Sequence, residues 1–184
     1  ASVASAGGAC RGSPIDSDFD KLAHFHDRGV RYITLAHSLS NHISDSSYDE
    51  NRQWDGLSEF GAELIAELNR LGIMIDISHV SDEAFWQVMD LSAVPAIASH
   101  SSARHYTPGW ERNMSDEMIV AMAEQGGVIQ INFGSSFVTQ EAREYSTPLY
   151  DALREWIAED PDNRNMAAAR TDFYPDYFAE HGPY

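Results

Sequence analysis

The stretch GIMIDISH, residues 72–79, decides the fold class of this chain. It starts at a glycine, is almost continuously apolar with β-branched residues, and ends in a histidine. Such a run predicts a short strand that is buried on both faces of a sheet. The stretches GVRYITLAH (29–37), VPAIASH (94–100) and GGVIQINF (126–133) share this character, and residues 3–8 form a weaker fifth candidate.

Amphipathic segments lie between these stretches and predict helices. Residues 57–71 carry one apolar stripe, which Gly72 brings to an end. Ser81 and Ser115 are each followed by an Asp-Glu pair, so each offers an N-cap oxygen and acidic residues for the first helical turn. A further helix is expected at about residues 17–28, ahead of the first strand.

The alternation of strands and helices predicts an α/β fold with a parallel sheet, either doubly wound or closed as a barrel. In both architectures functional groups gather at the carboxyl ends of the strands. The predicted strands finish in His37, His79, His100 and Asn132. Packing alone does not explain four polar endings in a row, so we expect a functional site at this edge.

Composition excludes several classes of partner. The chain has 184 residues, with 12 Lys and Arg against 29 Asp and Glu, a formal net charge of -17. This charge would repel nucleic acid and an anionic membrane surface. Apolar runs are too short to span a bilayer and residues 1–8 do not have the pattern of a signal peptide, so the sequence predicts a soluble protein of undetermined compartment. The single cysteine, Cys10, excludes an internal disulfide and a cysteine-based zinc cluster.

His79 and His100 are the candidate metal ligands. Neighbouring strand ends lie about 5 Å apart, so the two imidazoles could converge on one zinc ion. The alternative is that each histidine only forms a hydrogen bond to the following loop. Asp76 lies two residues before His79, and it could either orient that ligand or pack inside the fold.

The ordered motifs resemble those of the membrane (renal) dipeptidase family of zinc metallopeptidases. The resemblance covers about residues 15–138 and rests on GVRYITLAHS, GLSEFGAELIAELNRLGIMIDISHVSDEAF, VPAIASHSSAR, RNMSDEM and GGVIQINF. It implies an incomplete (β/α)8 TIM-type barrel of the metal-dependent hydrolase kind. Residues 1–138 would form the partial barrel. Residues 139–184 would form an excursion, with a helix at about 149–158 and a loop beyond, leading to the missing last strands.

The resemblance also implies roles for individual residues. His79 and His100 match two zinc ligands, and His37 matches a histidine that contacts the dipeptide and steadies the tetrahedral intermediate. Arg112 matches an arginine that binds the substrate carboxylate. Without the resemblance, a solvent-exposed arginine in a loop would be the expected role of this residue. The family holds two zinc ions, and this chain retains ligands for one only.

The sequence departs from the family pattern at three places. It has no His-x-Asp pair before residue 37, Cys10 stands at the position of the bridging glutamate, and the aspartate of the last strand is absent. Whether Cys10 is a ligand, a true loss or a sequence artefact stays open. We therefore expect a zinc-dependent dipeptidase whose present chain is a fragment, inactive alone. The alternatives are a metal-free barrel that binds carboxylate-bearing small molecules and a related amidohydrolase that acts on cyclic amides. The expected partner is a dipeptide substrate, and a homodimer stays open.

Overall fold

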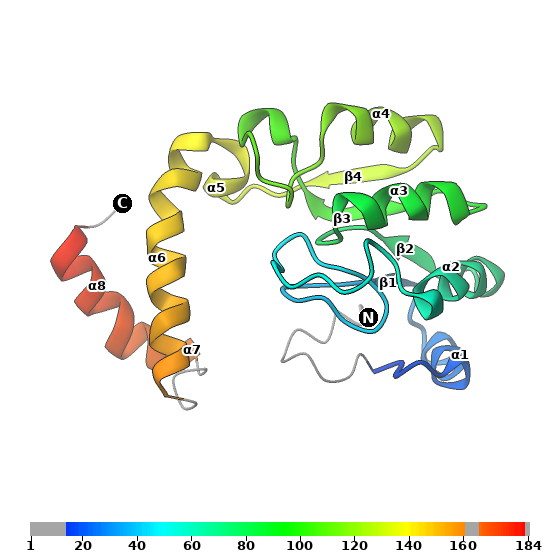
Figure 1. Cartoon of the computed structure of the whole chain (residues 1–184), viewed down its shortest axis with the longest axis horizontal. Coiled ribbons are helices and arrows are strands. Elements are labelled where there is room, and N and C mark those ends of the chain that lie inside the picture. The colour runs from blue at the N-terminus through cyan, green and yellow to red at the C-terminus, as the bar shows by residue number, and fades with distance from the viewer. Residues whose placement is uncertain (1–13, 161–165, 183–184) are drawn as a thin grey trace. The chain divides into compact units, whose positions relative to one another are not determined.

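The computed structural model describes residues 14–160 and 166–182 (Figure 1). The chain divides into two compact units, Ala1–Phe133 and Gly134–Tyr184. The weak strand expected at residues 3–8 and Cys10 lie outside the described residues.

A four-stranded sheet forms the centre of the first unit. Its strands are β1 (Tyr32–Thr34), β2 (Met74–Asp76), β3 (Ile97–Ser101) and β4 (Val128–Ile131), and they are parallel in the order β1-β2-β3-β4. This confirms the parallel α/β architecture. β1, β2 and β4 lie within predicted stretches, whereas β3 runs one residue beyond the stretch 94–100, to Ser101. Each strand is shorter than predicted, and the residues that follow β1 and β2 leave the ladder to form loops.

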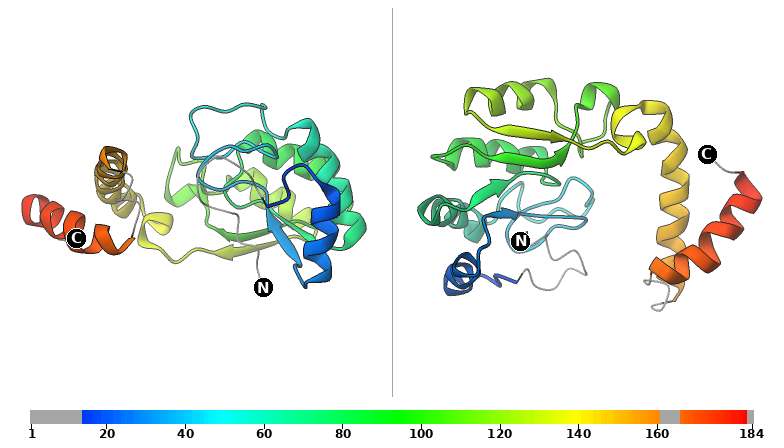
Figure 2. Two further views of the ribbon diagram at one scale, coloured as in Figure 1. Left: turned by 90° about the horizontal axis from the view of Figure 1, so that it is seen from below. Right: turned by 180° about the vertical axis from the view of Figure 1, so that it is seen from behind.

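The helices of the first unit are α1 (Phe19–Asp27), α2 (Glu59–Leu71), α3 (Asp82–Leu91) and α4 (Asp116–Glu124). Figure 2 shows them stacked in chain order, and each contacts the next. Sequential parallel strands require right-handed crossovers, which place the connecting helices on one face of a sheet. The arrangement is therefore that of successive βα units.

Serine side chains begin three of these helices. The Oγ atoms of Ser58, Ser81 and Ser115 each accept a hydrogen bond from a backbone N–H three residues further on. The caps expected at Ser81 and Ser115 are thus confirmed. At its other end α2 stops at Gly72, whose φ of 71° lies in the left-handed region that glycine adopts without strain.

The core of the first unit contains apolar residues of the sheet and of the helices. Leu64 and Leu68 of α2, Ile75 of β2 and Phe85 of α3 are almost completely buried in one cluster. Alternation along β2 gives its other residues a different environment, and Asp76 is also fully buried. A fully buried carboxylate needs hydrogen-bond partners. Those of Asp76 include the hydroxyl groups of Thr34 and Ser99.

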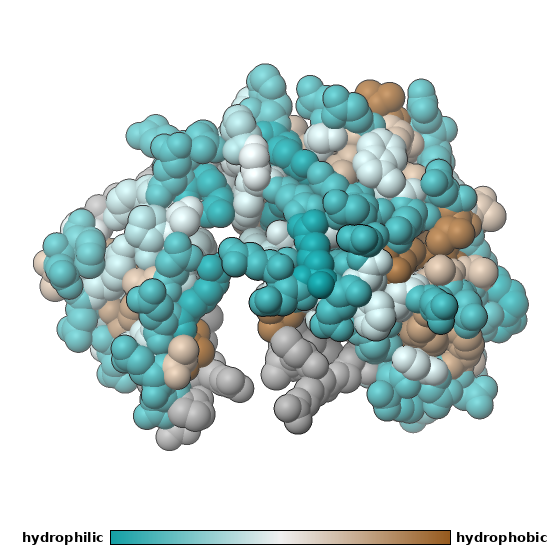
Figure 3. Space-filling view, viewed as in Figure 1, coloured by the Kyte–Doolittle hydropathy of each residue, from teal (hydrophilic) through white to brown (hydrophobic). Residues whose placement is uncertain are grey.

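The last strand has apolar side chains in contact with solvent. Val128, Ile131 and Phe133 are 54%, 49% and 88% exposed. Strands of parallel sheets are normally covered on both faces, so these exposed side chains lie on faces that the described residues leave uncovered. Elsewhere the face shown in Figure 3 is largely hydrophilic, as the excess of acidic residues leads one to expect.

The second unit is helical throughout its described residues, with α5 (Ser135–Val138), α6 (Gln140–Glu159), α7 (Met166–Ala168), a π-helical turn η3 (Ala169–Phe173) and α8 (Tyr174–His181). The helix expected at about 149–158 belongs to the longer α6, and the loop expected beyond it is wrong for residues 166–181.

An aromatic cluster explains why the end of the chain is helical. Phe173 contacts Trp156 of α6, with ring centroids 5.6 Å apart, and it stacks on Tyr177 at the same separation. Tyr174 and Phe178 stack one helical turn apart, at 6.1 Å. This spacing of three and four residues gives one helical face that packs against α6.

Within the described ranges, no helix combines the length and the apolar character needed to cross a membrane.

Candidate metal and substrate site

His79 and His100 approach each other at the carboxyl ends of β2 and β3. Their Nε2 atoms are 2.8 Å apart. Two imidazole nitrogens bound to one tetrahedral zinc at 2.0–2.1 Å would lie about 3.3 Å apart. Both lone pairs can therefore be directed at a common point with only a small displacement. The structure brings the two candidate ligands to the same side of the sheet.

His79 occupies an unusual backbone conformation. Its φ is 74°, in the left-handed region that non-glycine residues seldom adopt and that is enriched at functional positions. Its side chain is buried, and its carbonyl accepts a hydrogen bond from the N–H of Ser47 at 2.8 Å. The ring is packed between His37, at a centroid distance of 4.2 Å, and Tyr48, at 5.7 Å. The loop after β1 therefore fixes the position of this imidazole.

His37 is the third histidine of the site. It follows β1, is half-buried, and stacks on His79 at an interplanar angle of 27°. Its Nδ1 lies 2.8 Å from the hydroxyl of Ser38, and its carbonyl accepts a hydrogen bond from the Ser46 hydroxyl. The structure thus brings together all three histidines that the sequence analysis assigned to the site.

All three imidazoles are held in the neutral form. Burial, followed by the nearby charge of Arg112, lowers the pKa of His79 to about 2. The same two causes lower the pKa of His37 and of His100. A neutral imidazole is the form that binds a metal ion, because its free nitrogen lone pair is the donor.

Arg112 contacts His100 and Ser101 and is only 2% exposed. Its Nη2 donates to the carbonyl of His100 at 2.6 Å, and its Nη1 donates to the hydroxyl of Ser101 at 2.8 Å. Burial lowers the pKa of Arg112, and the hydroxyl of Tyr48 and the carboxylate of Asp76 act in the opposite direction. These contacts exclude the alternative of a solvated loop arginine.

None of the hydrogen bonds that the Asp76 carboxylate accepts in the structure comes from the His79 side chain. Its carboxylate accepts from the hydroxyls of Thr34 at 2.6 Å and Ser99 at 2.5 Å, and from the backbone N–H groups of Ser78 and Ser99. Ser99 in turn contacts Nδ1 of His100 at 2.7 Å. The sequence analysis overlooked Ser99. Its signal was the Ser-His dipeptide that occurs at both candidate ligands.

The loop after β1 is organised around another buried carboxylate. Asp45 accepts hydrogen bonds from the backbone N–H groups of Gln53, Trp54 and Gly56. Its own carbonyl accepts from the N–H of Ser81, at the start of α3. Sequence reasoning also missed this residue, although an aspartate among small polar residues is typical of side-chain to backbone turns.

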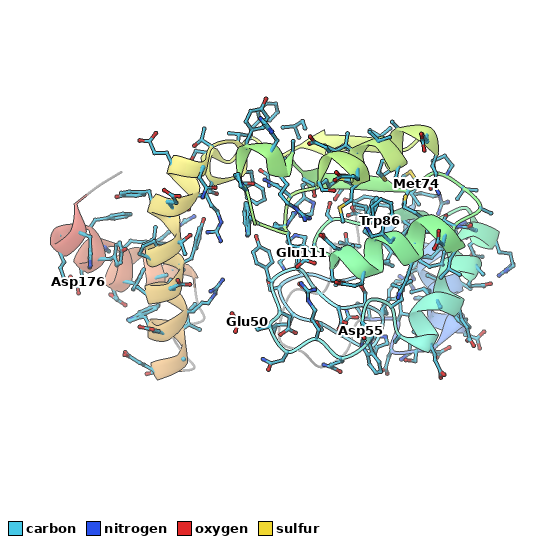
Figure 4. The ribbon with its side chains drawn as sticks, turned by 45° about the horizontal axis from the view of Figure 1, so that its top comes forward. Glu50, Asp55, Met74, Trp86, Glu111 and Asp176 are labelled. Atoms are coloured by element: carbon cyan, nitrogen blue, oxygen red, sulfur yellow. The ribbon has the colours of Figure 1, made fainter. Side chains whose placement is uncertain are left out.

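Ion pairs tie this loop to the first turn of α3 and to the loop that follows β3. Arg52 pairs with Glu83 at 3.0 Å and also with Glu111. Figure 4 shows Glu111 beside the start of α3, where its other oxygen accepts from the N–H of Asp82 at 2.7 Å. Arg104 pairs with the Asp82 carboxylate through two nitrogens, at 2.7 and 2.6 Å. The three loops at the carboxyl ends of the strands therefore form one connected rim.

The donor set suits zinc in kind but is small in number. Two imidazole nitrogens directed at one point fit a zinc ion, which prefers nitrogen and sulfur ligands. Within residues 14–160 and 166–182, however, no group of three or more His, Cys, Asp or Glu side chains is placed to hold a metal ion. Cys10 lies outside these ranges.

Successive βα units whose strand ends carry converging imidazoles are the arrangement of barrel-type metal-dependent hydrolases. Comparison with protein families identifies the group within that class. The model of the membrane dipeptidases (peptidase family M19) matches residues 1–167, and the chain belongs to this family.

Individual relatives agree with this assignment. An uncharacterised dipeptidase of Schizosaccharomyces pombe is 40% identical over 118 residues, which cover 64% of this chain and 29% of that protein. The crystal structure of the probable dipeptidase PvdM from Pseudomonas aeruginosa matches with a TM-score of 0.66 and 33% identity, over 79% of this chain and 37% of that one. A Rhodobacter sphaeroides metallopeptidase, liganded with a phosphinate mimic of the dipeptide L-Ala-D-Ala, matches with a TM-score of 0.62 and 30% identity, over 77% and 42%.

These matches define the fold as part of the TIM barrel of this family. The chain spans less than a third of the length of its curated relatives.

Proposed function

We propose that this protein is a zinc-dependent dipeptidase that hydrolyses the peptide bond of dipeptides. The observation that carries the proposal is the 2.8 Å approach of the His79 and His100 Nε2 atoms at the carboxyl edge of the sheet. Family membership supports it, and so does the dipeptide mimic bound by the Rhodobacter sphaeroides relative. Further ligands would come from residues outside the described ranges, and we expect the 184-residue chain alone to be inactive or nearly so.

His79 and His100 would hold the zinc ion. A bound zinc lowers the pKa of water towards neutrality and polarises the carbonyl under attack. The protein contributes by keeping both imidazoles neutral and by fixing their direction.

His37 would contact the substrate beside the metal. Its ring stacks on that of His79, so a group bound at His79 is within its reach. A neutral imidazole can donate its N–H to an oxygen atom that becomes negative in the transition state. His37 would therefore stabilise the tetrahedral intermediate without changing its own charge.

Arg112 would attract the carboxylate of the dipeptide. Its charge lowers the pKa of all three histidines, so its field extends across the whole site. In a buried position a full charge acts more strongly than it does in water. The field that disfavours imidazolium would favour a bound carboxylate by the same argument.

The test compares a dipeptide with its C-terminal amide in the zinc-loaded protein, produced at the full length of its natural gene. L-Ala-D-Ala should be hydrolysed, as measured by amine release, and its amide should be a poorer substrate because Arg112 finds no carboxylate. In Arg112→Met the difference between the two substrates should disappear. Unchanged hydrolysis after dialysis against a chelator would contradict the proposal.

A second candidate is a metal-free protein that binds small carboxylates. The absence of a three-donor metal group from the described part of the chain favours it. Calorimetric titration with a dipeptide in the presence of a chelator separates the two candidates. A pure binder would retain its affinity there, whereas the dipeptidase should bind more weakly without zinc.

A further inference from the structure

The Asp76 carboxylate is fully buried between β1 and β3, where its two oxygens accept four hydrogen bonds. One oxygen receives hydroxyl groups from both neighbouring strands, Thr34 on one side and Ser99 on the other. A buried carboxylate with this many donors is a strong and fixed acceptor. Its two hydroxyl partners therefore have little freedom in the direction of their protons.

The hydroxyl of Ser99 is placed between a carboxylate and an imidazole. It lies 2.5 Å from Oδ2 of Asp76 and 2.7 Å from Nδ1 of His100. A serine hydroxyl has one proton to donate, and a carboxylate can only accept. The Ser99 proton therefore goes to Asp76, and the Ser99 oxygen is left to accept a proton from His100. This requires that Nδ1 of His100 carries the hydrogen.

A neutral imidazole with its hydrogen on Nδ1 has its lone pair on Nε2. That atom of His100 is the one that approaches His79. The backbone N–H of His100 also donates to the Ser78 hydroxyl at 3.0 Å, which holds the residue in place along the strand. Ser78 thus fixes the backbone of His100, and Ser99 fixes the direction and the tautomer of its ring.

His79 is held in a different way. Its Nδ1 is buried and makes no hydrogen bond to any residue in the described part of the chain. Its ring position comes from packing between His37 and Tyr48. The two imidazoles are therefore not equivalent, since only His100 has a hydrogen-bonded partner at its Nδ1.

We propose that Asp76 and Ser99 are positioning residues that hold His100 as the Nδ1–H tautomer and direct its Nε2 lone pair at the metal position. The metal position rests on the function proposed above, whereas the tautomer of His100 does not. Outer partners of metal-binding histidines are typically worth about 10- to 100-fold in metal affinity, because they fix ring orientation and raise ligand basicity.

The decisive variant is Ser99→Ala. It removes the hydroxyl bridge but leaves Asp76 with the Thr34 hydroxyl and two backbone donors. The matched control is Thr34→Val, which removes the other hydroxyl from the same carboxylate oxygen at a comparable cost in stability but does not touch His100. Ser99→Thr retains a hydroxyl at this position and serves as the conservative rescue.

The first readout is the nitrogen NMR spectrum of His100 in the 184-residue chain with a chelator present. We expect a protonated Nδ1 and an unprotonated Nε2 in the wild type, Thr34→Val and Ser99→Thr, and a mixture of tautomers in Ser99→Ala. The second readout is zinc affinity, measured by competition with a chromogenic chelator. Ser99→Ala should weaken it about tenfold or more, and Thr34→Val should leave it within about twofold.

A wild-type spectrum with the hydrogen on Nε2 of His100 would overturn the proposal, and no variant needs to fold for that result. So would a Thr34→Val protein that changes as much as Ser99→Ala. Because the tautomer is read without metal or substrate, failure of the full-length protein to cleave dipeptides would refute the proposed function and leave this inference standing.

Discussion

Nε2 of His79 and Nε2 of His100 lie 2.8 Å apart, although 21 residues and helix α3 separate them in the chain. The approach follows from the parallel pairing of β2 with β3, in which Asp76 is the partner of Ile97. Both imidazoles have a lowered pKa and are neutral, so in the metal-free chain one of the two Nε2 atoms carries a hydrogen and donates it to the other. A metal ion bound by both Nε2 lone pairs would replace this hydrogen bond.

Removing either imidazole should therefore abolish tight zinc binding. We expect His79→Ala and His100→Ala each to lose more affinity than the roughly 10- to 100-fold that an outer partner is worth. His105→Ala is the matched control, because His105 is exposed and lies outside the site. Competition titration against a chromogenic chelator measures all three, and equal affinities for the three variants would remove the metal site from consideration.

Acid should destabilise the metal-free chain through His79. Its pKa is about 2 in the folded state and about 6.5 when unfolded, so the unfolded chain binds the extra proton as the pH falls below about 6.5. The contribution of neutral His79 is complete above that value and decreases below it, by at most about 1.4 kcal/mol per pH unit.

Urea denaturation at pH 7, 6 and 5 with a chelator present measures this dependence. In His79→Asn, which tolerates the positive φ of this position, the slope should be smaller. The slope should not vanish, because the pKa values of His37 and His100 are also lowered. A variant with the wild-type slope would show that His79 is not protected from protonation.

Asp45 should stabilise the loop after β1 at neutral pH. Burial raises the pKa of Asp45, but hydrogen bonds from the backbone of Gln53, Gly56 and Trp54 and from the Ser40 hydroxyl outweigh it, and the pKa lies below its usual value. Its contribution is thus present above about pH 4 and lost as the pH falls through the lowered folded-state value.

Asp45→Asn replaces one accepting oxygen by a donor that faces backbone N–H groups, so it should reduce the free energy of unfolding at pH 7 by about 1–3 kcal/mol. The same substitution at the exposed Asp55 is the control, with an expected effect below about 0.5 kcal/mol. Thermal denaturation at pH 7 and pH 4 compares them. Equal losses at the two positions would argue against the loop structure described here.

Gly61 should not tolerate a side chain. An added Cβ would meet the carbonyl oxygen of Ile43 at 2.1 Å, and this neighbour is backbone, which cannot rotate away. Gly61→Ala should therefore destabilise the chain by about 1–3 kcal/mol or more, through overpacking where α2 meets the loop after β1.

Gly72→Ala is the informative comparison. Nothing lies within 4 Å of a Cβ at Gly72, so its cost comes only from the left-handed φ and should be about 1–2 kcal/mol. Chemical denaturation of both variants separates a steric clash from backbone strain. If Gly61→Ala were the more stable of the two, the close contact with Ile43 would be in error.

Local patterns were sufficient to predict the parallel sheet and its helices. Glycine followed by β-branched residues marked β2, and serine followed by acidic residues marked the starts of α3 and α4. These signals are local, because a cap or a buried strand is determined by a few adjacent residues. The strand ends also directed attention to His37, His79 and His100.

Features that depend on distant contacts could not be predicted in this way. The role of Asp76 depends on which side chains of β1 and β3 lie opposite it, and that register is absent from the local pattern of β2.

At the end of the chain Pro148 lies inside α6, although proline disfavours a helix interior. The helices after residue 165 depend on aromatic contacts between Phe173 and Trp156. In both cases tertiary packing outweighs local preference.

The N–H of Ser47 is bonded to the carbonyl of His79 itself, and Ser46 is bonded to the carbonyl of His37. The loop after β1 therefore contacts the main chain of two site histidines as well as the ring of His79. A ligand that displaces this loop would pull on those peptide groups and turn the imidazoles. The position of this loop and the direction of the two imidazoles are therefore coupled.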